Sequence, residues 1–299
     1  MYQQIASNKR RTLILMVGFV AFIWAVAWVI ALASGRPALI YVIGVAALLY
    51  AVIGYYASAS VALALSGAQS VTKQQAPELY RIVENLAIAS GLPMPQVYVI
   101  NDASPNAFAT GRDPQHAVVA VTTGLLDIMN KSELEGVIAH ELSHVGNYDT
   151  RLMAIVIVLV TIVTFISHFF LRMTFWGGNR DNEGNQAQAI FLAIGLVLAI
   201  LSPIIAALLQ LAVSRKREYL ADASGALLTR YPEGLASALA KIDAAPRGMR
   251  KANSATAHLY IASPFKNESG LGGWLADLFS THPPIKDRIN RLEHMEANP

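Results

Sequence analysis

SELEGVIAHELSHVG, residues 132–146, is the stretch of sequence that decides the fold and the chemistry of this chain. It contains an H-E-x-x-H motif in which His140 and His144 are four residues apart. On a helix this spacing puts both imidazoles on one face, where they could bind one metal ion. Glu141 lies between them and is turned so that its carboxylate could act on a water molecule at the metal. The motif therefore predicts a zinc-dependent hydrolase.

The helix that carries this motif has a predicted start and no clear end. Ser132, followed three residues later by Glu135, fits a capping box. After His144 the only helix breaker before the apolar segment at residue 152 is Gly146. We therefore expect the helix to begin near Ser132 and to continue into that apolar segment.

The third metal ligand must come from another part of the chain. A catalytic zinc site usually has three protein ligands and one open position, and the chain has no cysteine. Glu218 and Asp222 are four residues apart, so they share one helix face. Glu218 could bind the metal while Asp222 accepts a hydrogen bond from a ligand imidazole. An exposed helix face paired with nearby arginines explains this spacing equally well, so spacing alone leaves both readings open.

The composition indicates a membrane protein. The chain of 299 residues is 54% hydrophobic and 14% charged, against about 25% charged residues in ordinary soluble domains. Four segments are long and apolar enough to cross a bilayer as helices, and we place them near residues 12–34, 38–60, 152–172 and 188–213. The first is longer than the roughly 7–15 apolar residues of a signal peptide, so we expect it to be a retained anchor.

Basic residues predict the orientation of these spans. Basic clusters at residues 9–11 and 215–217 flank the first and last spans, whereas the loop after the first span holds only Arg36 and the loop after the third has no positive excess. Since basic residues favour the cytoplasmic side, we expect both termini and residues 67–150 to be cytoplasmic. The net charge of +3 is small, and the basic residues lie mainly at span ends, so we expect no nucleic-acid partner.

The remaining sequence has the patterns of a soluble domain. Residues 77–90 predict an amphipathic helix with Gly91 as its stop, and residues 96–100, 106–111 and 116–122 predict short strands. Residues 214–299 predict helices interrupted by prolines. We divide the chain into residues 1–66 (N-terminal tail and membrane helices one and two), 67–151 (first part of the catalytic domain), 152–213 (membrane helices three and four) and 214–299 (second part of the catalytic domain).

Several stretches together resemble the HtpX-type integral-membrane zinc metalloproteases, which are relatives of the CAAX prenyl endoproteases. The resemblance covers residues 65–295 and the two N-terminal spans. The matching stretches are PELY at 77–80, NAFA at 106–109, residues 140–149, REY at 217–219 with AD at 221–222, and THPP at 281–284 with Arg288. The resemblance implies a mainly α fold: a four-helix transmembrane protein with a cytoplasmic, zincin-like metalloprotease domain that carries a small β-sheet.

The resemblance also implies roles for residues at the metal. Glu218 would be the third zinc ligand beside His140 and His144, with one zinc ion per subunit. Asp222 would orient a ligand. Glu141 would be the general base.

Residues further from the motif receive roles in the same way. His282 and Arg288 resemble a catalytic pair near the metal that stabilises the oxyanion of the reaction. Residues 106–109 resemble an edge strand that pairs with an extended substrate peptide, a mode that recognises the backbone and tolerates varied sequences. The residues of this substrate strand are Asn106, Ala107, Phe108 and Ala109.

With these motifs, the resemblance implies a zinc metalloendopeptidase of the bacterial inner membrane that hydrolyses misfolded or damaged membrane proteins in a stress response. Expected partners are membrane-protein substrates, the lipid bilayer and other membrane proteases. One alternative is a site-specific processing protease for a defined substrate, with or without a lipid modification. A second is a transporter or scaffold with a vestigial metal site. Transporters usually bury charges in their spans, whereas the four apolar segments hold no charge-bearing side chain inside the span beyond His168, since Arg172 stands at the end of the third.

Overall fold

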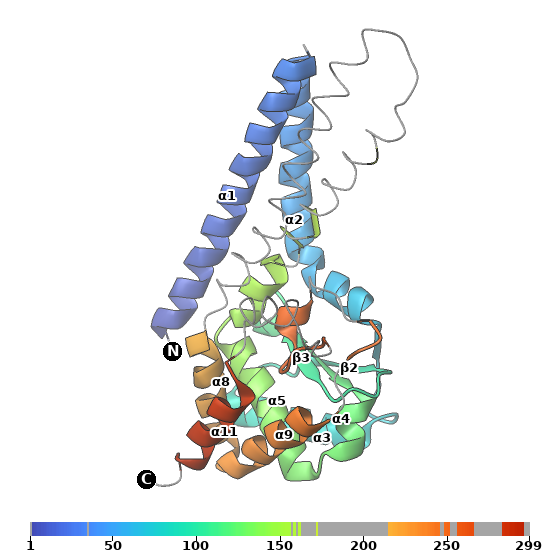
Figure 1. Ribbon diagram of the computed structural model, residues 1–299, viewed down its shortest axis with the longest axis vertical. Helices are drawn as coiled ribbons and strands as arrows, with labels where there is room; N and C mark the ends of the chain where they lie inside the picture. Colours follow the sequence, from blue (N-terminus) through green and yellow to red (C-terminus); the bar gives the residue numbers. More distant parts are fainter. Residues whose placement is uncertain are drawn as a thin grey trace, which may run out of the picture.

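The computed structural model describes residues 2–34, 36–156, 158–159, 161–162, 172, 215–245, 248–251, 256–265 and 283–295. Two long helices form an arm that rises from a body built of shorter helices and a small sheet (Figure 1). The N-terminus lies at the lower end of the arm, beside the body (Figure 1). The described part is mainly helical with one small sheet, as the sequence predicts.

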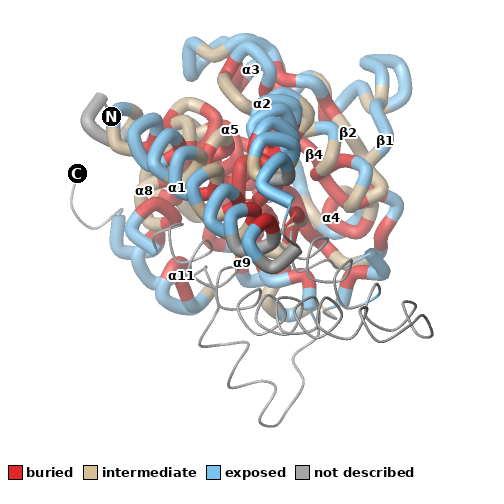
Figure 2. Tube along the Cα trace, turned by 90° about the horizontal axis from the view of Figure 1, so that it is seen from above, coloured by how far each residue is buried: buried red, intermediate tan, exposed pale blue. Residues whose placement is uncertain are grey.

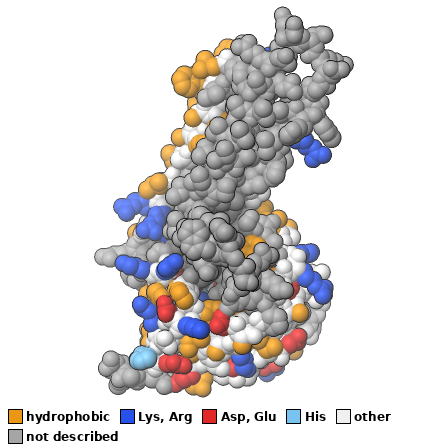
Figure 3. All heavy atoms as spheres, in the orientation of Figure 1, with side chains coloured by type: hydrophobic (Ala, Val, Ile, Leu, Met, Phe, Trp, Pro, Cys, Tyr) orange, Lys and Arg blue, Asp and Glu red, His pale blue; other side chains and the backbone are white. Residues whose placement is uncertain are grey.

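The arm consists of α1 (Tyr2–Ser34) and α2 (Ala38–Ser66), which pack against each other. Within them, Ile5–Trp28 and Ile40–Ser66 are long and apolar enough to cross a membrane, with a mean hydropathy of 1.9. Large apolar side chains on both helices are exposed, among them Leu13, Trp28, Tyr41 and Ile53. On the face shown in Figure 3, the visible side chains of the arm are mainly hydrophobic, whereas charged side chains lie mostly on the body. Exposed apolar surface of this extent fits contact with lipid.

These two helices correspond to the first two predicted spans. The predicted spans at 152–172 and 188–213 lie largely outside the described residues.

The sheet has four strands in the order β1-β2-β4-β3. The strands are β1 (Ala68–Ser70), β2 (Gln96–Ile100), β3 (Ala107–Thr110) and β4 (Val118–Thr122). β2 and β4 are parallel, while the β1–β2 and β3–β4 pairs are antiparallel. The three predicted strands are confirmed to within two residues, and β1 is an additional short edge strand. The 3-10 turn η1 (Pro114–His116) connects β3 to β4.

The sheet separates two hydrophobic cores. Val119 and Val121 of β4 face a core shared with the helices of the body, whereas Val118 and Ala120 face the lower end of the arm. This alternation follows from the two-residue period of a strand. Since both faces are covered, all residues of β3 and β4 are buried.

The helices of the body gather around α5 (Lys131–Gly146). It packs against α3 (Pro77–Ser90), α8 (Arg215–Thr229) and α9 (Pro232–Ala244), and Figure 2 shows it buried at the centre of the body. The prediction for α3 is confirmed, with Gly91 at φ 69° as its C-cap. The other elements are α4 (Thr123–Ile128), η2 (Ala257–Leu259) and α11 (Ile285–Glu293).

The predicted start of α5 is wrong by two residues. Asn130, not Ser132, is the N-cap, and its side chain accepts a hydrogen bond from the backbone of Glu133. The Glu133 carboxylate accepts from the Asn130 backbone at 2.8 Å, which completes the capping box. Glu133, and not Glu135, forms the capping box because its carboxylate also binds Lys241 at 2.7 Å and Ser237 at 2.6 Å, both on α9.

The predicted continuation of α5 toward the membrane is also wrong. The helix ends at Gly146, with Asn147 as its C-cap, and a further helix begins at Asp149. Tyr148 between them has φ 60°, a left-handed conformation that is uncommon for a residue with a side chain. The chain therefore turns at residues 147–148, and the turn sets the position of Asp149.

Candidate metal centre

The centre forms where α8 lies unusually close to α5. A Cβ atom on Gly225 of α8 would lie 2.9 Å from the backbone nitrogen of His140 and 3.2 Å from its Cα atom. Only glycine fits at this distance without a shift of one helix. Glu218, Asp222 and Gly225 share one face of α8 because their spacing is four and three residues. The close approach at Gly225 thus brings both carboxylates to the histidines of α5.

His140, His144 and Glu218 converge on one point. Their potential ligand atoms all lie within 4.8 Å of one another, and all three side chains are buried. The two Nε2 atoms are 3.2 Å apart, and Glu218 lies 3.8 Å from Nε2 of His140 and 3.5 Å from Nε2 of His144. The structure therefore brings together the three residues that the sequence predicts as metal ligands.

A hydrogen-bonded carboxylate orients the ring of His140. Nδ1 of His140 lies 2.9 Å from Oδ1 of Asp222. Arg288 on α11 is fully buried and donates to both oxygens of Asp222, at 2.9 and 2.7 Å. The predicted contact between Asp222 and a ligand imidazole is thus present in the geometry. Such contacts fix the ring orientation and raise the basicity of the ligand nitrogen.

The structure places Arg288 behind His140. Besides its two bonds to Asp222, it donates from its NH1 group to the carbonyl of Ile261 at 3.0 Å and lies 3.7 Å from Glu218. These contacts make it a group that holds Asp222. The predicted oxyanion role of Arg288 stays a prediction, and its predicted partner His282 lies outside the described residues.

A second carboxylate, which the sequence reasoning did not single out, orients His144. Nδ1 of His144 lies 3.1 Å from Oδ2 of Asp149. The other oxygen of Asp149 accepts from Asn8 at 2.7 Å and lies 3.4 Å from Arg217. Asp149 lies only five residues after His144. An acidic residue this close to the motif could have been predicted from the sequence as a partner of a ligand histidine. Asn8 on α1 gave no signal in the sequence.

The chemistry of these donors fits a cation. If each Nδ1–H donates to its aspartate, the lone pairs of both Nε2 atoms point toward each other and toward Glu218. Like lone pairs at 3.2 Å repel unless a positive charge lies between them. Burial lowers the pKa of His144, but Asp149, Glu218 and Glu141 together raise it to about 9. The surrounding carboxylates therefore stabilise positive charge at this point, which a metal ion would also supply.

Glu141 is buried and joins the centre to the sheet. Its Oε2 atom accepts a hydrogen bond from the backbone N–H of Ala109 on β3 at 2.7 Å. Burial raises the pKa of Glu141 to about 7, with Glu218 acting in the same direction and His144 against it. A carboxylate with this pKa can accept and release a proton near neutral pH.

The predicted substrate strand lies at the edge of the sheet, but this edge is partly covered. The carbonyl of Ala107 accepts from the backbone N–H of Ile261 at 2.9 Å. The side chain of Asn106 donates to the carbonyl of Ala262 at 2.9 Å. Phe108 points to the opposite core, where its ring packs edge-on against Tyr260. Ala109 is thus the strand residue that lies closest to the catalytic motif.

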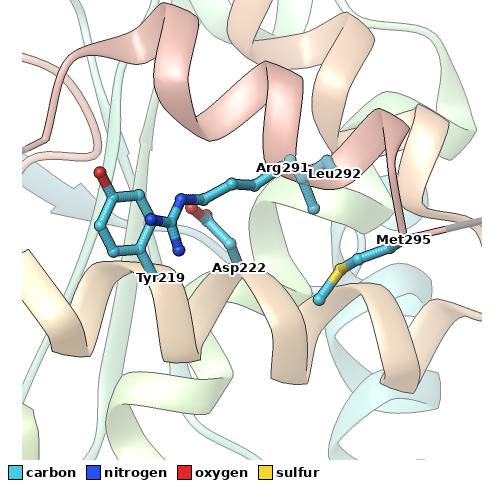
Figure 4. A pocket seen from close by; sticks show the side chains of 5 residues that line it. All are labelled: Tyr219, Asp222, Arg291, Leu292 and Met295. Atoms are coloured by element: carbon cyan, nitrogen blue, oxygen red, sulfur yellow. The ribbon is translucent and has the colours of Figure 1, made fainter.

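A surface hollow of about 240 Å³ lies between α8 and α11. Figure 4 shows the guanidinium of Arg291 stacked over the ring of Tyr219, 3.8 Å from its centroid, with Asp222 behind them. Leu292 and Met295 complete the lining. None of the three candidate ligands lines this hollow. The hollow therefore lies on the side of Asp222 away from the metal centre.

Comparison with known proteins agrees with this geometry. Residues 73–296 match the model of peptidase family M48.

The chain belongs to peptidase family M48.

Relatives from several bacteria cover nearly the whole chain. A protease HtpX homolog of Ligilactobacillus salivarius is 45% identical over 99% of this chain and 100% of that protein. HtpX homologs of Tropheryma whipplei (48%, over 99% of this chain and 98% of that protein) and Lactobacillus acidophilus (49%, over 99% and 100%) are similar. Among solved structures, the crystal structure of S. mikatae Ste24p is 17% identical, with a TM-score of 0.48 over 98% of this chain and 67% of that chain. The M48 match and the HtpX homologs confirm the HtpX-type resemblance and the prediction of a metallopeptidase.

Proposed function

We propose that this M48 metallopeptidase is a zinc-dependent endopeptidase of the bacterial inner membrane that cleaves membrane proteins. The observation that carries the proposal is the convergence of His140 and His144 of α5 with Glu218 of α8, with Glu141 between the two histidines on α5. A zinc ion bound by two histidines and one glutamate, with an open position, is a catalytic ligand set.

His140, His144 and Glu218 would hold one zinc ion per chain. When bound there, zinc acts as a Lewis acid that activates water and polarises the peptide carbonyl. The protein holds its ligands in place through two aspartates, Asp222 at His140 and Asp149 at His144. Because both rings are fixed by carboxylates, neither has to reorient when the substrate binds.

Glu141 would move the proton. Its Oε2 is held by the N–H of Ala109, which leaves Oε1 as the oxygen that takes a proton from the attacking water. The same oxygen then delivers the proton to the amine of the leaving peptide. A pKa raised to about 7 by burial suits both transfers.

The substrate peptide would lie extended along β3. Ala107 already uses its carbonyl for Ile261, and Ala109 uses its N–H for Glu141. We therefore place the pairing of the peptide backbone at the carbonyl of Ala109, next to Glu141. Pairing with a strand edge recognises the peptide backbone rather than particular side chains. This mode suits a protease that removes misfolded or damaged membrane proteins of varied sequence, which is the role we propose.

The arm supports a site at the membrane surface. α1 and α2 carry exposed apolar side chains, and Asn8 at the lower end of α1 contacts residues directly after the metal-binding helix. We propose four spans with the termini and the centre in the cytoplasm, so that cytoplasmic loops and tails of membrane proteins are the segments cut.

The test uses the full chain purified in detergent. Wild type should contain about one zinc ion per chain and cleave an unfolded protein substrate such as casein. Glu141→Gln should keep the metal and lose proteolysis by several orders of magnitude, whereas Glu218→Ala should lose both. Unchanged metal content in Glu218→Ala would contradict the ligand assignment. Cleavage of one defined substrate with no activity on unfolded proteins would favour a processing protease instead.

A further inference from the structure

Asn8 is a buried polar side chain in the first turns of α1, among polar and basic residues that precede the apolar stretch of the helix. It is 3% exposed and lies within the membrane-compatible part of α1. Its amide nitrogen donates to Oδ1 of Asp149 at 2.7 Å and to the carbonyl of Asn147 at 2.9 Å. Both partners lie about 140 residues further along the chain. The contact therefore docks the first helix of the arm on the turn that follows α5.

Asp149 in turn contacts a candidate metal ligand, His144. Its Oδ2 lies 3.1 Å from Nδ1 of His144. Arg217 is a second, longer contact of Asp149, at 3.4 Å, so Asn8 is the shorter of the two donors to Oδ1. We propose that Asn8 is a positioning residue, which fixes the carboxylate of Asp149 and through it the ring of His144. This inference rests on the proposed metal binding by His144.

The same arrangement occurs on the other histidine. There Arg288 holds Asp222, and Asp222 holds the ring of His140. The two arrangements differ in the origin of the anchor, because Arg288 comes from α11 in the body and Asn8 from the arm. One half of the centre therefore depends on how a membrane helix is seated.

The turn at residues 147–149 is held by contacts with residues 8 and 9 of α1. The carbonyl of Asn147 belongs to the end of α5, where helix carbonyls lack intrahelical partners, and Asn8 satisfies it. Lys9 lies over the ring of Tyr148 at 4.6 Å, beside the backbone at φ 60°. Residues 8 and 9 thus contact all three residues 147–149. A displacement of α1 would reach Asp149 directly.

The experiment measures Co²⁺ affinity in the full-length chain. All variants carry Glu141→Gln so that the protein does not digest itself, and affinity is read by competition with a chelator together with the visible absorption bands of bound Co²⁺. Asn8→Leu removes the donor, and Asn8→Asp replaces it with a carboxylate facing Asp149. We expect about tenfold weaker binding for the first, at the lower end of the range for groups that orient ligands, a larger loss for the second, and altered Co²⁺ bands in both.

Two comparisons separate positioning from general stability. Thr12→Val is the matched control, because Thr12 is buried one turn further along α1 and its hydroxyl has no hydrogen-bond partner in the described part of the chain. It should bind Co²⁺ like the parent. Asn8→Gln keeps an amide donor on a longer side chain and should recover part of the affinity. Thermal unfolding of the metal-free proteins is measured in parallel, and the altered Co²⁺ bands of the Asn8 variants, which a loss of stability alone does not produce, separate positioning from stability.

The outcomes distinguish this inference from the proposed function. If the parent binds no Co²⁺, or if Glu218→Ala binds it equally well, the proposed metal centre is wrong. If the parent binds Co²⁺ and both Asn8→Leu and Asn8→Asp keep its affinity and absorption bands, only the positioning role is wrong. Should Asn8→Leu not fold, the isosteric Asn8→Asp decides by the same criterion.

Discussion

Gly225 offers a direct test of whether the spacing of two helices sets the metal centre. Gly225→Ala places a Cβ atom 2.9 Å from the backbone nitrogen of His140, whereas unstrained heavy atoms lie about 3.5 Å apart or more. One helix must therefore move by roughly 0.6 Å. Metal–ligand distances are defined to about 0.2 Å, so this movement is large enough to separate Glu218 from the two histidines.

The effect on stability is expected to be smaller than the effect on metal binding. Overpacking of a tight contact costs about 1–3 kcal/mol, but alanine stabilises a helix by about 1 kcal/mol relative to glycine. We expect a net loss of stability of at most about 2 kcal/mol, with at least about tenfold weaker metal binding. Chelator competition gives the affinity, and thermal unfolding of the metal-free protein gives the stability.

A different glycine, Gly146 on α5, provides the control. A Cβ atom on Gly146 would meet only the side chain of Leu92, at 3.8 Å, which is ordinary contact. Gly146→Ala should therefore leave metal affinity unchanged. If Gly225→Ala also binds metal like wild type, the close approach of α8 to α5 is not what brings the ligands together, and this reasoning is refuted.

Three further changes test other contacts. Asp222→Ala should weaken metal binding about 10–100-fold, measured by chelator competition, and an unchanged affinity would remove Asp222 from the centre. Ala109→Pro deletes the N–H that holds Glu141 and should reduce proteolysis while metal content, read by elemental analysis, is kept; Ala109→Gly, which keeps the N–H, is its control. Glu133→Gln keeps an acceptor for the capping box but removes the charge that faces Lys241, and should lower the unfolding temperature at pH 7 through the loss of about 1 kcal/mol or less. Although burial acts in the opposite direction, hydrogen bonds from Lys241 and Ser237 lower the pKa of Glu133 in the folded state, so this stability is present above the usual glutamate pKa and is lost as pH falls through the lowered value. The difference between wild type and variant should therefore shrink in acid, and a difference that grows would contradict it.

Local patterns in the sequence predicted most of the elements around the centre. The apolar spacing of α3, its glycine stop, and the strands at 96–100 and 116–122 needed only neighbouring residues. The capping box was misplaced because Asn130–Glu133 and Ser132–Glu135 have the same spacing. Contacts with α9, which is distant in sequence, choose between them.

The candidate metal ligands could be predicted because the motif places His140 and His144 on one helix face and the resemblance implies Glu218. Asn8 and the coverage of β3 by Ile261 could not, since both depend on segments that meet only in the folded protein. The end of α5 was missed for another reason. Tyr148 adopts a left-handed conformation that its residue type disfavours, and contacts with Lys9 and Arg151 surround its ring.

The order of the active-site residues along the chain has a consequence for biosynthesis. α5 is made first, Glu218 on α8 follows, and Arg288 on α11 comes last. At about 5–20 residues per second, the ribosome needs several seconds to pass from Glu218 to Arg288. Until then Asp222 lacks the guanidinium that holds it. We therefore expect the centre of a growing chain to stay incomplete until synthesis is nearly finished, so that neighbouring proteins that are still being inserted meet a less active peptidase.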